Sequence, residues 1–222
     1  MTHYMAELAL TGQPVLVVGG GKVARRKLTG LLQTGARITV IAPQVCEAIK
    51  QLDQQEQIAW QMDHFSADLL DGQQPGQPHW RLVFAATGEA PLNRQIATLC
   101  AAKGLLCNSA DGTTENGFHV PAMVRQGPIT IGVATGGLSP ALSRILKSRV
   151  EAALEPGWGG LVTLFGAMRD EVKRRLPQAQ SRYTFWRQIA LDAEAQQRFE
   201  STDNRNWFNK QLNAAEKGQE EH

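Results

Sequence analysis

Cysteine is scarce in this sequence. The chain has three, Cys46, Cys100 and Cys107, and no two of them form a C-x-x-C pair. An odd number without such a pair argues against a disulfide framework and against a structural zinc site. We therefore predict a reducing, cytoplasmic location, with Cys100 and Cys107 as small apolar residues of the core.

Long apolar runs and a strong excess of charge are also lacking. No stretch approaches the roughly 18 apolar residues that a membrane-spanning helix needs. The first ten residues have neither the basic start nor the apolar run of a secretory signal. The formal net charge of +2 is too small to indicate a nucleic acid or a membrane surface as partner. With 42% hydrophobic and 20% charged residues, the composition is typical of a soluble globular protein.

The best-defined pattern lies between residues 14 and 42 and predicts a strand, a helix and a second strand. The apolar run 14–18 is typical of a buried parallel strand. Gly35 stands where a helix C-terminus favours a left-handed residue, and the β-rich run 37–41 follows it. Helical spacing links the apolar residues between them, Ala24, Leu28, Leu31 and Leu32.

The turn between the first strand and the helix carries the pattern G-x-G-x-x-A, formed by Gly19, Gly21 and Ala24. Gly19 lets the chain turn sharply out of the strand, and Gly21 has no Cβ, so a pyrophosphate can approach the backbone. Ala24 lets the helix pack closely on the sheet, and the free N–H groups at the helix start face the phosphates. We predict dinucleotide binding by the glycine turn, residues 19–21. The competing interpretation is a tight turn in an ordinary α/β protein.

The acidic residue that usually holds the adenosine ribose is missing. It should lie roughly 20 residues beyond the turn, at the end of the second strand. That place reads Ile41-Ala42-Pro43-Gln44, so backbone groups or Gln44 must hold the ribose. Arg25, Arg26 and Lys27 could favour an extra phosphate or simply face solvent. The sequence alone does not separate NAD from NADP.

Further strands and helices complete a doubly wound parallel sheet. We predict strands at 58–61, 81–86 and 105–107 and a helix at 91–103, with a surface loop at 71–80. Ligands of such sheets lie off the carboxyl ends of the strands. Three segments meet there: Gly19–Val23, Thr87-Gly88 and Asn108–Asp111.

The pattern changes after Asp111. Residues 118–135 read as two short strands about a Gln126-Gly127 turn, and this pair needs a further surface to be stable. Ser139-Pro140 is a good helix start. The remaining sequence is helical, with a frayed end at 213–222. We expect the helix after Ser139 to bury Leu142, Ile145, Leu146 and Ala153, and the next segment to bury Leu161, Leu164, Phe165, Met168, Val172 and Leu176.

Several segments together resemble the dehydrogenase and ferrochelatase module of the siroheme synthase family. They are VVGGGKVARRK, FAAT, CNSAD, FHVPAMV and ATGGLSPALSRILK. The glycine pattern is shared with many dehydrogenases, whereas CNSAD at its distance from the last block is more specific. The likeness runs from about residue 10 to residue 175.

The resemblance implies NAD-dependent oxidation of precorrin-2 to sirohydrochlorin, and in some members insertion of Fe2+ as a second substrate. It implies a homodimer that binds a tetrapyrrole. The cysteines predict the cytoplasm, and the small net charge and the lack of long apolar runs predict neither a nucleic acid nor a membrane as partner. The implied fold is α/β: a Rossmann-like parallel-sheet domain at 1–112, a small strand-containing dimerisation region at 113–155 and a helical domain at 156–222. The family's nucleotide contacts fall on Lys22, Val23, Pro43 and Gln44, beside the glycine turn Gly19, Gly20 and Gly21 that the motif predicts. From their place at the strand ends we predict that Thr87 and Asn108 orient cofactor or substrate through hydrogen bonds; no metal ligand is assigned.

The essential aspartate of the family falls on Asp111. Two further observations support a catalytic role. Asp111 follows a strand at the edge of the sheet where ligands bind, and a dehydrogenation needs a base for the proton that leaves with the hydride. The competing interpretation is a turn residue before Gly112. A Rossmann module that senses NAD without catalysis is the alternative function.

Overall fold

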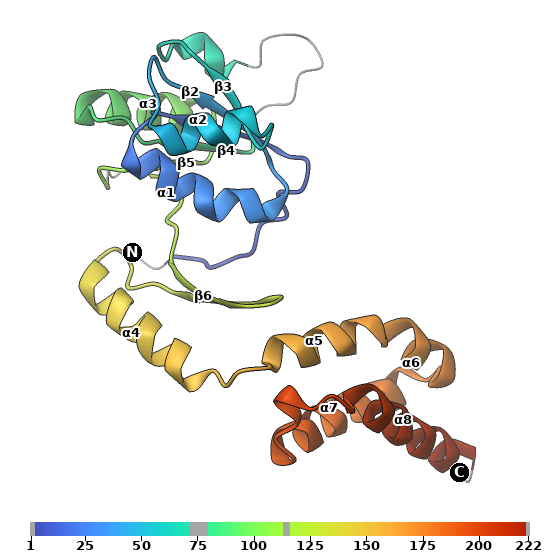
Figure 1. The fold of residues 1–222 in the computed structure, drawn as a ribbon. Coiled ribbons are helices and arrows are strands. Elements are labelled where there is room, and N and C mark those ends of the chain that lie inside the picture. The colour runs from blue at the N-terminus through green and yellow to red at the C-terminus, as the bar shows by residue number, and fades with distance from the viewer. Residues whose placement is uncertain (1–2, 72–79, 113–115, 221–222) are drawn as a thin grey trace. The chain divides into compact units, whose positions relative to one another are not determined.

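The computed structural model describes residues 3–71, 80–112 and 116–220 (Figure 1). The chain divides into two compact units, Met1–Val120 and Pro121–His222, which are described separately here. The predicted surface loop at 71–80 falls almost wholly outside the described residues.

A five-stranded parallel sheet forms the centre of the first unit, in the order β3-β2-β1-β4-β5. The central strand β1 is buried along its whole length, as an apolar run covered by helices on both faces should be. The predicted bounds of the first two strands are confirmed. The strands are β1 (Pro14–Val18), β2 (Arg37–Ile41), β3 (Ala59–Gln61), β4 (Leu82–Ala85) and β5 (Cys107–Ser109).

Helices cover both faces of this sheet (Figure 1). On one face, α1 (Lys22–Leu31) and α2 (Glu47–Gln54) pack on alternate residues of β1 and β4. On the other face, α3 (Ala90–Ala102) buries Ile96 and Cys100 against the intervening residues of the same strands. Short 3-10 turns occur at Leu32–Thr34 and Ala67–Leu70. The predicted α/β class with a Rossmann-like sheet is confirmed.

The fifth strand lies two residues later than predicted. It begins at Cys107, whereas the sequence predicts 105–107. Leu105 donates its N–H to the carbonyl of Cys100 at 2.9 Å, so this residue still closes the end of α3. Asn108 and Ser109 consequently belong to the strand and are buried.

The second unit opens with an antiparallel strand pair, β6 (Ala122–Gln126) and β7 (Ile129–Val133). Helix α4 (Pro140–Ala153) follows, and the Ser139 hydroxyl caps it by accepting a hydrogen bond from the N–H of Leu142 at 3.2 Å. The strand pair and the cap are confirmed. The predicted burial along α4 is wrong for the single chain, in which this helix buries no residue: exposed fractions are 54% for Leu142, 52% for Ile145 and 42% for Leu146.

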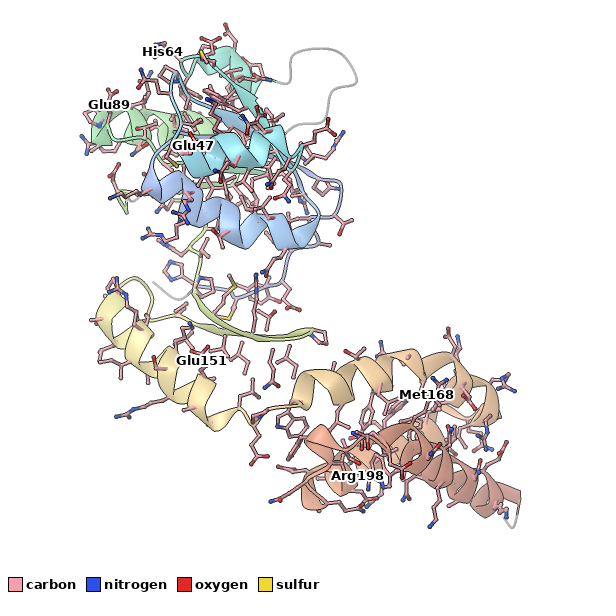
Figure 2. All side chains as sticks on the ribbon, viewed as in Figure 1. Glu47, His64, Glu89, Glu151, Met168 and Arg198 are labelled. Atoms are coloured by element: carbon pink, nitrogen blue, oxygen red, sulfur yellow. The ribbon has the colours of Figure 1, made fainter. Side chains whose placement is uncertain are left out.

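The rest of the second unit is a helical cluster with its own core. Met168, labelled in Figure 2, is 2% exposed where α5 meets α6. The predicted apolar stripe lies in this core, although Leu164 and Phe165 are only partly buried. The helices are α5 (Trp158–Ala167), α6 (Arg169–Arg175), α7 (Ala179–Ala195) and α8 (Asn204–Glu220), with a 3-10 turn at Arg198–Glu200.

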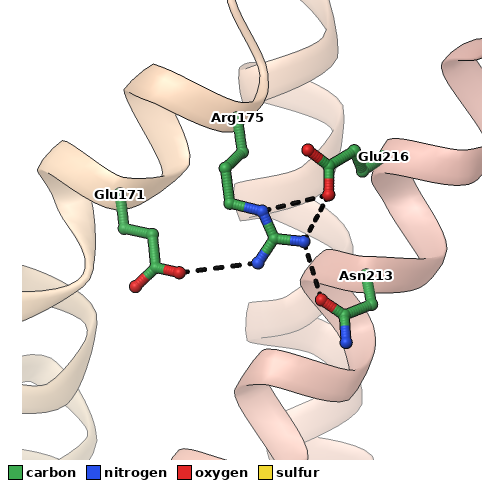
Figure 3. Close-up of polar contacts among 4 residues, drawn as sticks. All are labelled: Glu171, Arg175, Asn213 and Glu216. Atoms are coloured by element: carbon green, nitrogen blue, oxygen red, sulfur yellow. Dashed lines mark hydrogen bonds and ion pairs between the residues drawn. The ribbon is translucent and has the colours of Figure 1, made fainter.

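The predicted frayed end at 213–222 is helical as far as Glu220, and its last two positions lie outside the described residues. Helix α8 continues to Glu220, and the Arg175 guanidinium of α6 holds it (Figure 3). Arg175 Nε donates to Glu216 Oε2 at 3.1 Å, and a second guanidinium nitrogen donates to the same carboxylate and to Asn213. These partners are 41 and 38 positions away from Arg175, so no local pattern could indicate them.

Candidate cofactor site

The glycine turn after β1 is shaped by close backbone contacts. Gly19 has φ +119°, and a Cβ atom there would lie 2.3 Å from the carbonyl oxygen of Ala86. A Cβ on Gly20 would lie 2.0 Å from the carbonyl oxygen of Gln44. A Cβ on Gly21 would meet nothing within 4 Å. Two of the glycines are therefore required by the protein itself, whereas the third leaves open space where a phosphate group can approach.

Helix α1 begins at this turn with the features of an anion site. Its N-cap, Gly21, supplies no side-chain cap, and its first turn contains no acidic residue. The N–H groups of the first turn of a helix lack intrahelical acceptors and carry partial positive charge. Lys22 is exposed and Val23 is half-buried in this turn, while Ala24 is fully buried against the sheet. The residues present therefore fit a pyrophosphate.

The segment after β2 lies against the glycine turn. Cys46 donates its N–H to the carbonyl of Gly20 at 2.8 Å. Trp60 Nε1 donates to the carbonyl of Ala42 at 2.9 Å and so holds the start of the segment. Pro43 and Gln44 are both exposed. This arrangement brings the predicted ribose-binding residues beside the predicted phosphate-binding ones.

The side chain of Asn93, which is not among the predicted site residues, joins Thr87 to Asp111. Asn93 Nδ2 donates to Asp111 Oδ2 at 2.7 Å and to the Thr87 carbonyl at 3.2 Å. Asn93 Oδ1 accepts from the Thr87 N–H at 3.0 Å and from its hydroxyl at 2.8 Å. The hydroxyl also contacts the backbone of Glu89, the residue labelled just before α3 in Figure 2. The ends of β4 and β5 are thus connected by one amide.

A sequence signal for Asn93 does exist. Positions 93, 96, 97 and 100 share the helical spacing of one buried face, and the structure buries all four residues. A lone amide on an otherwise apolar helix face must find hydrogen-bond partners inside the protein. The helix predicted at 91–103 rests on its apolar pattern alone, which gives no role to a polar residue on the buried face.

Asn108 lies on the face of the sheet that packs against α1. Its Nδ2 donates to the Phe118 carbonyl at 3.0 Å, whereas its buried Oδ1 has no partner among the described residues. The Phe118 ring packs edge-on against Phe84 with centroids 5.3 Å apart, and Lys27 Nζ lies 5.8 Å from the Phe84 centroid. Burial lowers the pKa of Lys27, and the charge of Arg26 adds to this. A buried acceptor without a partner costs about 1–3 kcal/mol, so a donor from a ligand would be favourable here.

Most of the predicted site residues, but not the buried Asn108, form one continuous row across the sheet edge. Gln44 contacts Gly20, and Gly19 adjoins Thr87, whose amide nitrogen would lie 2.9 Å from a Cβ on that glycine. Thr87 connects through Asn93 to Asp111, which is exposed. The order of these residues follows the strand order β2-β1-β4-β5.

The described residues contain no group of three or more histidine, cysteine, aspartate or glutamate side chains that could hold a metal ion. His119, which lies beyond β5, packs edge-on against the ring of His3, with centroids 5.2 Å apart.

Within the described parts of the chain, none of the helices has the length and apolar character needed to cross a membrane.

Family models match both units. The model described as "Putative NAD(P)-binding" matches residues 7–122, about half of the chain. The model described as "Sirohaem synthase dimerisation region" matches residues 157–212. The second match lies beyond residues 113–155, whose assignment as dimerisation region remains a prediction.

Siroheme synthases are among the curated relatives. The protein from Psychrobacter sp. (strain PRwf-1) is 39% identical over 177 residues, which are 80% of this chain and 35% of the relative. The protein from Photorhabdus laumondii is 34% identical over 179 residues, which are 81% of this chain and 37% of the relative. The chain therefore spans about a third of the length of these relatives.

A solved structure, that of SirC, precorrin-2 dehydrogenase, has the same fold. Its TM-score is 0.77 at 23% identity, over 96% of this chain and 100% of that one.

Proposed function

We propose, from the premise that the chain belongs to the NAD(P)-binding family matched over residues 7–122, that it is an NAD-dependent precorrin-2 dehydrogenase. The names of its relatives, siroheme synthase and precorrin-2 dehydrogenase, support this substrate. The observation that carries the proposal is the continuous row from Gln44 through the glycine turn to Asp111. It puts an anion-binding helix start and a carboxylate on the same edge of one sheet.

In this proposal NAD, when bound, would supply the hydride acceptor for the oxidation of precorrin-2 to sirohydrochlorin, a reaction in which the substrate also loses a proton. The N–H groups of Lys22 and Val23 hold the pyrophosphate. Thr87 and Asn108 orient the nicotinamide or the substrate through hydrogen bonds. The Asp111 carboxylate accepts the proton, a role that requires it to stay ionised and within hydrogen-bond reach.

The ribose contact is the part of the cofactor site that departs from the common pattern. The end of β2 has no carboxylate, since Ala42 is buried and Pro43 and Gln44 follow it. We assign the ribose to the exposed Gln44 and its backbone, and we assign NAD as the cofactor.

We further propose ferrous iron as a second substrate, inserted into sirohydrochlorin after its oxidation. Asp111 is the carboxylate in the row of candidate site residues, and it could bind the metal or accept a pyrrole proton. Since the described residues hold no ligand cluster, the macrocycle itself would supply the remaining ligands. This activity is separable from the first, because it needs no NAD.

A homodimer in the cytoplasm is the proposed state of the protein. The match to a dimerisation region supports it, as does the apolar surface of α4, which the single chain leaves exposed. The three cysteines are all free thiols, which agrees with a reducing compartment.

An anaerobic assay tests the function in two steps. Precorrin-2 and NAD are mixed with the protein, NADH and sirohydrochlorin are followed by absorbance, and Fe2+ is then added. We expect NADH in the first step and siroheme in the second. Asp111→Ala should lower the first rate by about 100-fold or more and abolish the second, while Asp68→Ala, at an exposed aspartate on a 3-10 turn, should resemble the wild type.

The possible failures are distinguishable. NAD binding without any turnover would make the chain a nucleotide sensor and overturn the enzymatic proposal. Turnover that Asp111→Ala leaves unchanged would keep the dehydrogenase but remove Asp111 from its mechanism. NADH formation without siroheme would limit the protein to the dehydrogenation.

A further inference from the structure

Asn93 is the most completely bonded polar side chain at the candidate site. It is 0% exposed, and its amide makes two hydrogen bonds as donor and two as acceptor. A primary amide has two N–H donors and one oxygen with two lone pairs. The capacity of this side chain is therefore fully used by two partners, Thr87 and Asp111.

Its location explains why two strand ends depend on it. The regular bonds at this edge end with Ala86 donating to Val18 and Ala110 donating to Ala85, each at 2.8 Å. Beyond them, Thr87 and Asp111 have no ladder bond to each other. Asn93 enters from the first turn of α3, anchored by its own N–H to the Glu89 carbonyl at 3.0 Å, and supplies the missing connection.

We propose that Asn93 is the positioning residue for Asp111. This inference rests on the proposed dehydrogenase function, in which Asp111 accepts a proton. The amide donates to Oδ2 and so fixes the rotation of the carboxylate, while its oxygen holds Thr87 beside the glycine turn. One buried side chain thereby fixes the distance between Thr87, beside the glycine turn, and the proposed proton acceptor Asp111.

An amide side chain is needed to bond Thr87 and Asp111 at the same time, because it has both donors and an acceptor. An ionised aspartate at position 93 would still accept from the Thr87 N–H and hydroxyl, but it has no donor for Asp111 or for the Thr87 carbonyl. It would also bring a second negative charge against Asp111. Asn93→Asp is therefore a near-isosteric change that keeps one half of the connection and removes the other.

The test compares kcat, the precorrin-2 KM, the NAD dissociation constant and the thermal midpoint. We expect Asn93→Asp to lower kcat by about 10-fold or more, because misplacement of a reacting group by about 1 Å can cost 100-fold. NAD affinity and KM should stay within about 2-fold of the wild type, since two of the three bonds to Thr87, those from its N–H and hydroxyl, remain. Gln95→Asp, at an exposed amide two positions away on the same helix, is the matched control.

Each outcome decides the inference. A kcat for Asn93→Asp within about 2-fold of the wild type overturns it, as does a parallel loss of NAD affinity, which would mean that Asn93 only supports the Thr87 loop. If Asn93→Asp does not fold, Asn93→Ser is measured by the same criteria. A fully active Asp111→Ala would instead remove the proposed role of Asp111, so the two failures remain separate.

Discussion

The carbonyl oxygen of Gln44 lies 2.0 Å from the position that a Cβ atom on Gly20 would occupy, whereas Gly21 faces open space. Gly20 is therefore constrained by the protein, whereas no protein atom constrains Gly21, the proposed phosphate contact. The two neighbouring glycines offer a way to separate folding from cofactor recognition.

We predict that Gly21→Ala folds normally but binds NAD weakly. Its φ of −90° suits an L residue and no atom obstructs the new methyl, so the thermal midpoint should stay unchanged. The NAD dissociation constant should rise by about 10-fold, equal to 1.4 kcal/mol, because the methyl blocks the approach of the pyrophosphate. Calorimetric titration and thermal unfolding measure both quantities. Unaltered NAD affinity would argue against a phosphate at this turn.

Gly20→Ala should behave differently, with a lower thermal midpoint in the absence of NAD. The new methyl would collide with the backbone at Gln44 and Val45 and displace that segment. Overpacking that shifts the backbone in this way costs about 1–3 kcal/mol. A midpoint equal to that of the wild type would show that the segment yields without cost.

The exposed apolar stripe of α4 predicts a change in assembly. Ile145→Asp places a charge in the stripe that also contains Leu142 and Leu146, and a buried unpaired charge at an interface is strongly unfavourable. We expect a dimer for the wild type and a monomer for this variant by light scattering. Ser148→Asp, at an exposed polar position of the same helix, should remain dimeric. A monomeric wild type would contradict the proposed homodimer.

The contact between Arg175 and Glu216 predicts an acid-sensitive part of stability. A hydrogen bond from Arg175 is the main cause that lowers the pKa of Glu216 from its ordinary value of 4.5. The folded state thus binds this proton less readily than the unfolded state, so the stabilisation is present above pH 4.5 and is lost as the pH falls through the lower, folded pKa. The effect should be modest, because exposed ion pairs contribute little.

Thermal unfolding between neutral and acid pH checks this point. Glu216→Gln should lower the midpoint slightly at neutral pH and flatten its fall at acid pH relative to the wild type. Parallel curves for the two proteins would mean that Glu216 does not contribute.

The three cysteines should differ in reactivity. A hydrogen bond between the thiols of Cys100 and Cys107, followed by burial, raises the pKa of Cys100, and the same bond lowers the pKa of Cys107. Both thiols are buried, whereas Cys46 is half-buried. A disulfide reagent should therefore label Cys46 first in the native protein, and all three after denaturation. Rapid native labelling of Cys107 would contradict the packing of β5 against α3.

Local patterns predicted the first β-α-β unit well. Apolar runs and glycines decide where β1, α1 and β2 begin and end, and these signals lie within a few residues of the elements they shape. The cap of α4 by Ser139 is of the same kind.

The errors come from contacts that the sequence does not display. The start of β5 depends on how α3 ends at Cys100, and the exposure of α4 depends on surfaces outside the single chain. Among the candidate site residues, the glycine turn was predicted from its motif and Asp111 from the family resemblance. The connection through Asn93 joins positions 18 residues apart and needed the folded chain to become visible.

The bonds from Arg175 to α8 bear on how this protein should be shortened. The matched family region stops at residue 212, just before the two α8 partners of that guanidinium, Asn213 and Glu216. A version trimmed at that boundary would leave a partly shielded cation facing solvent and strip the last turns from α8. Fragments prepared for expression should therefore extend past residue 216.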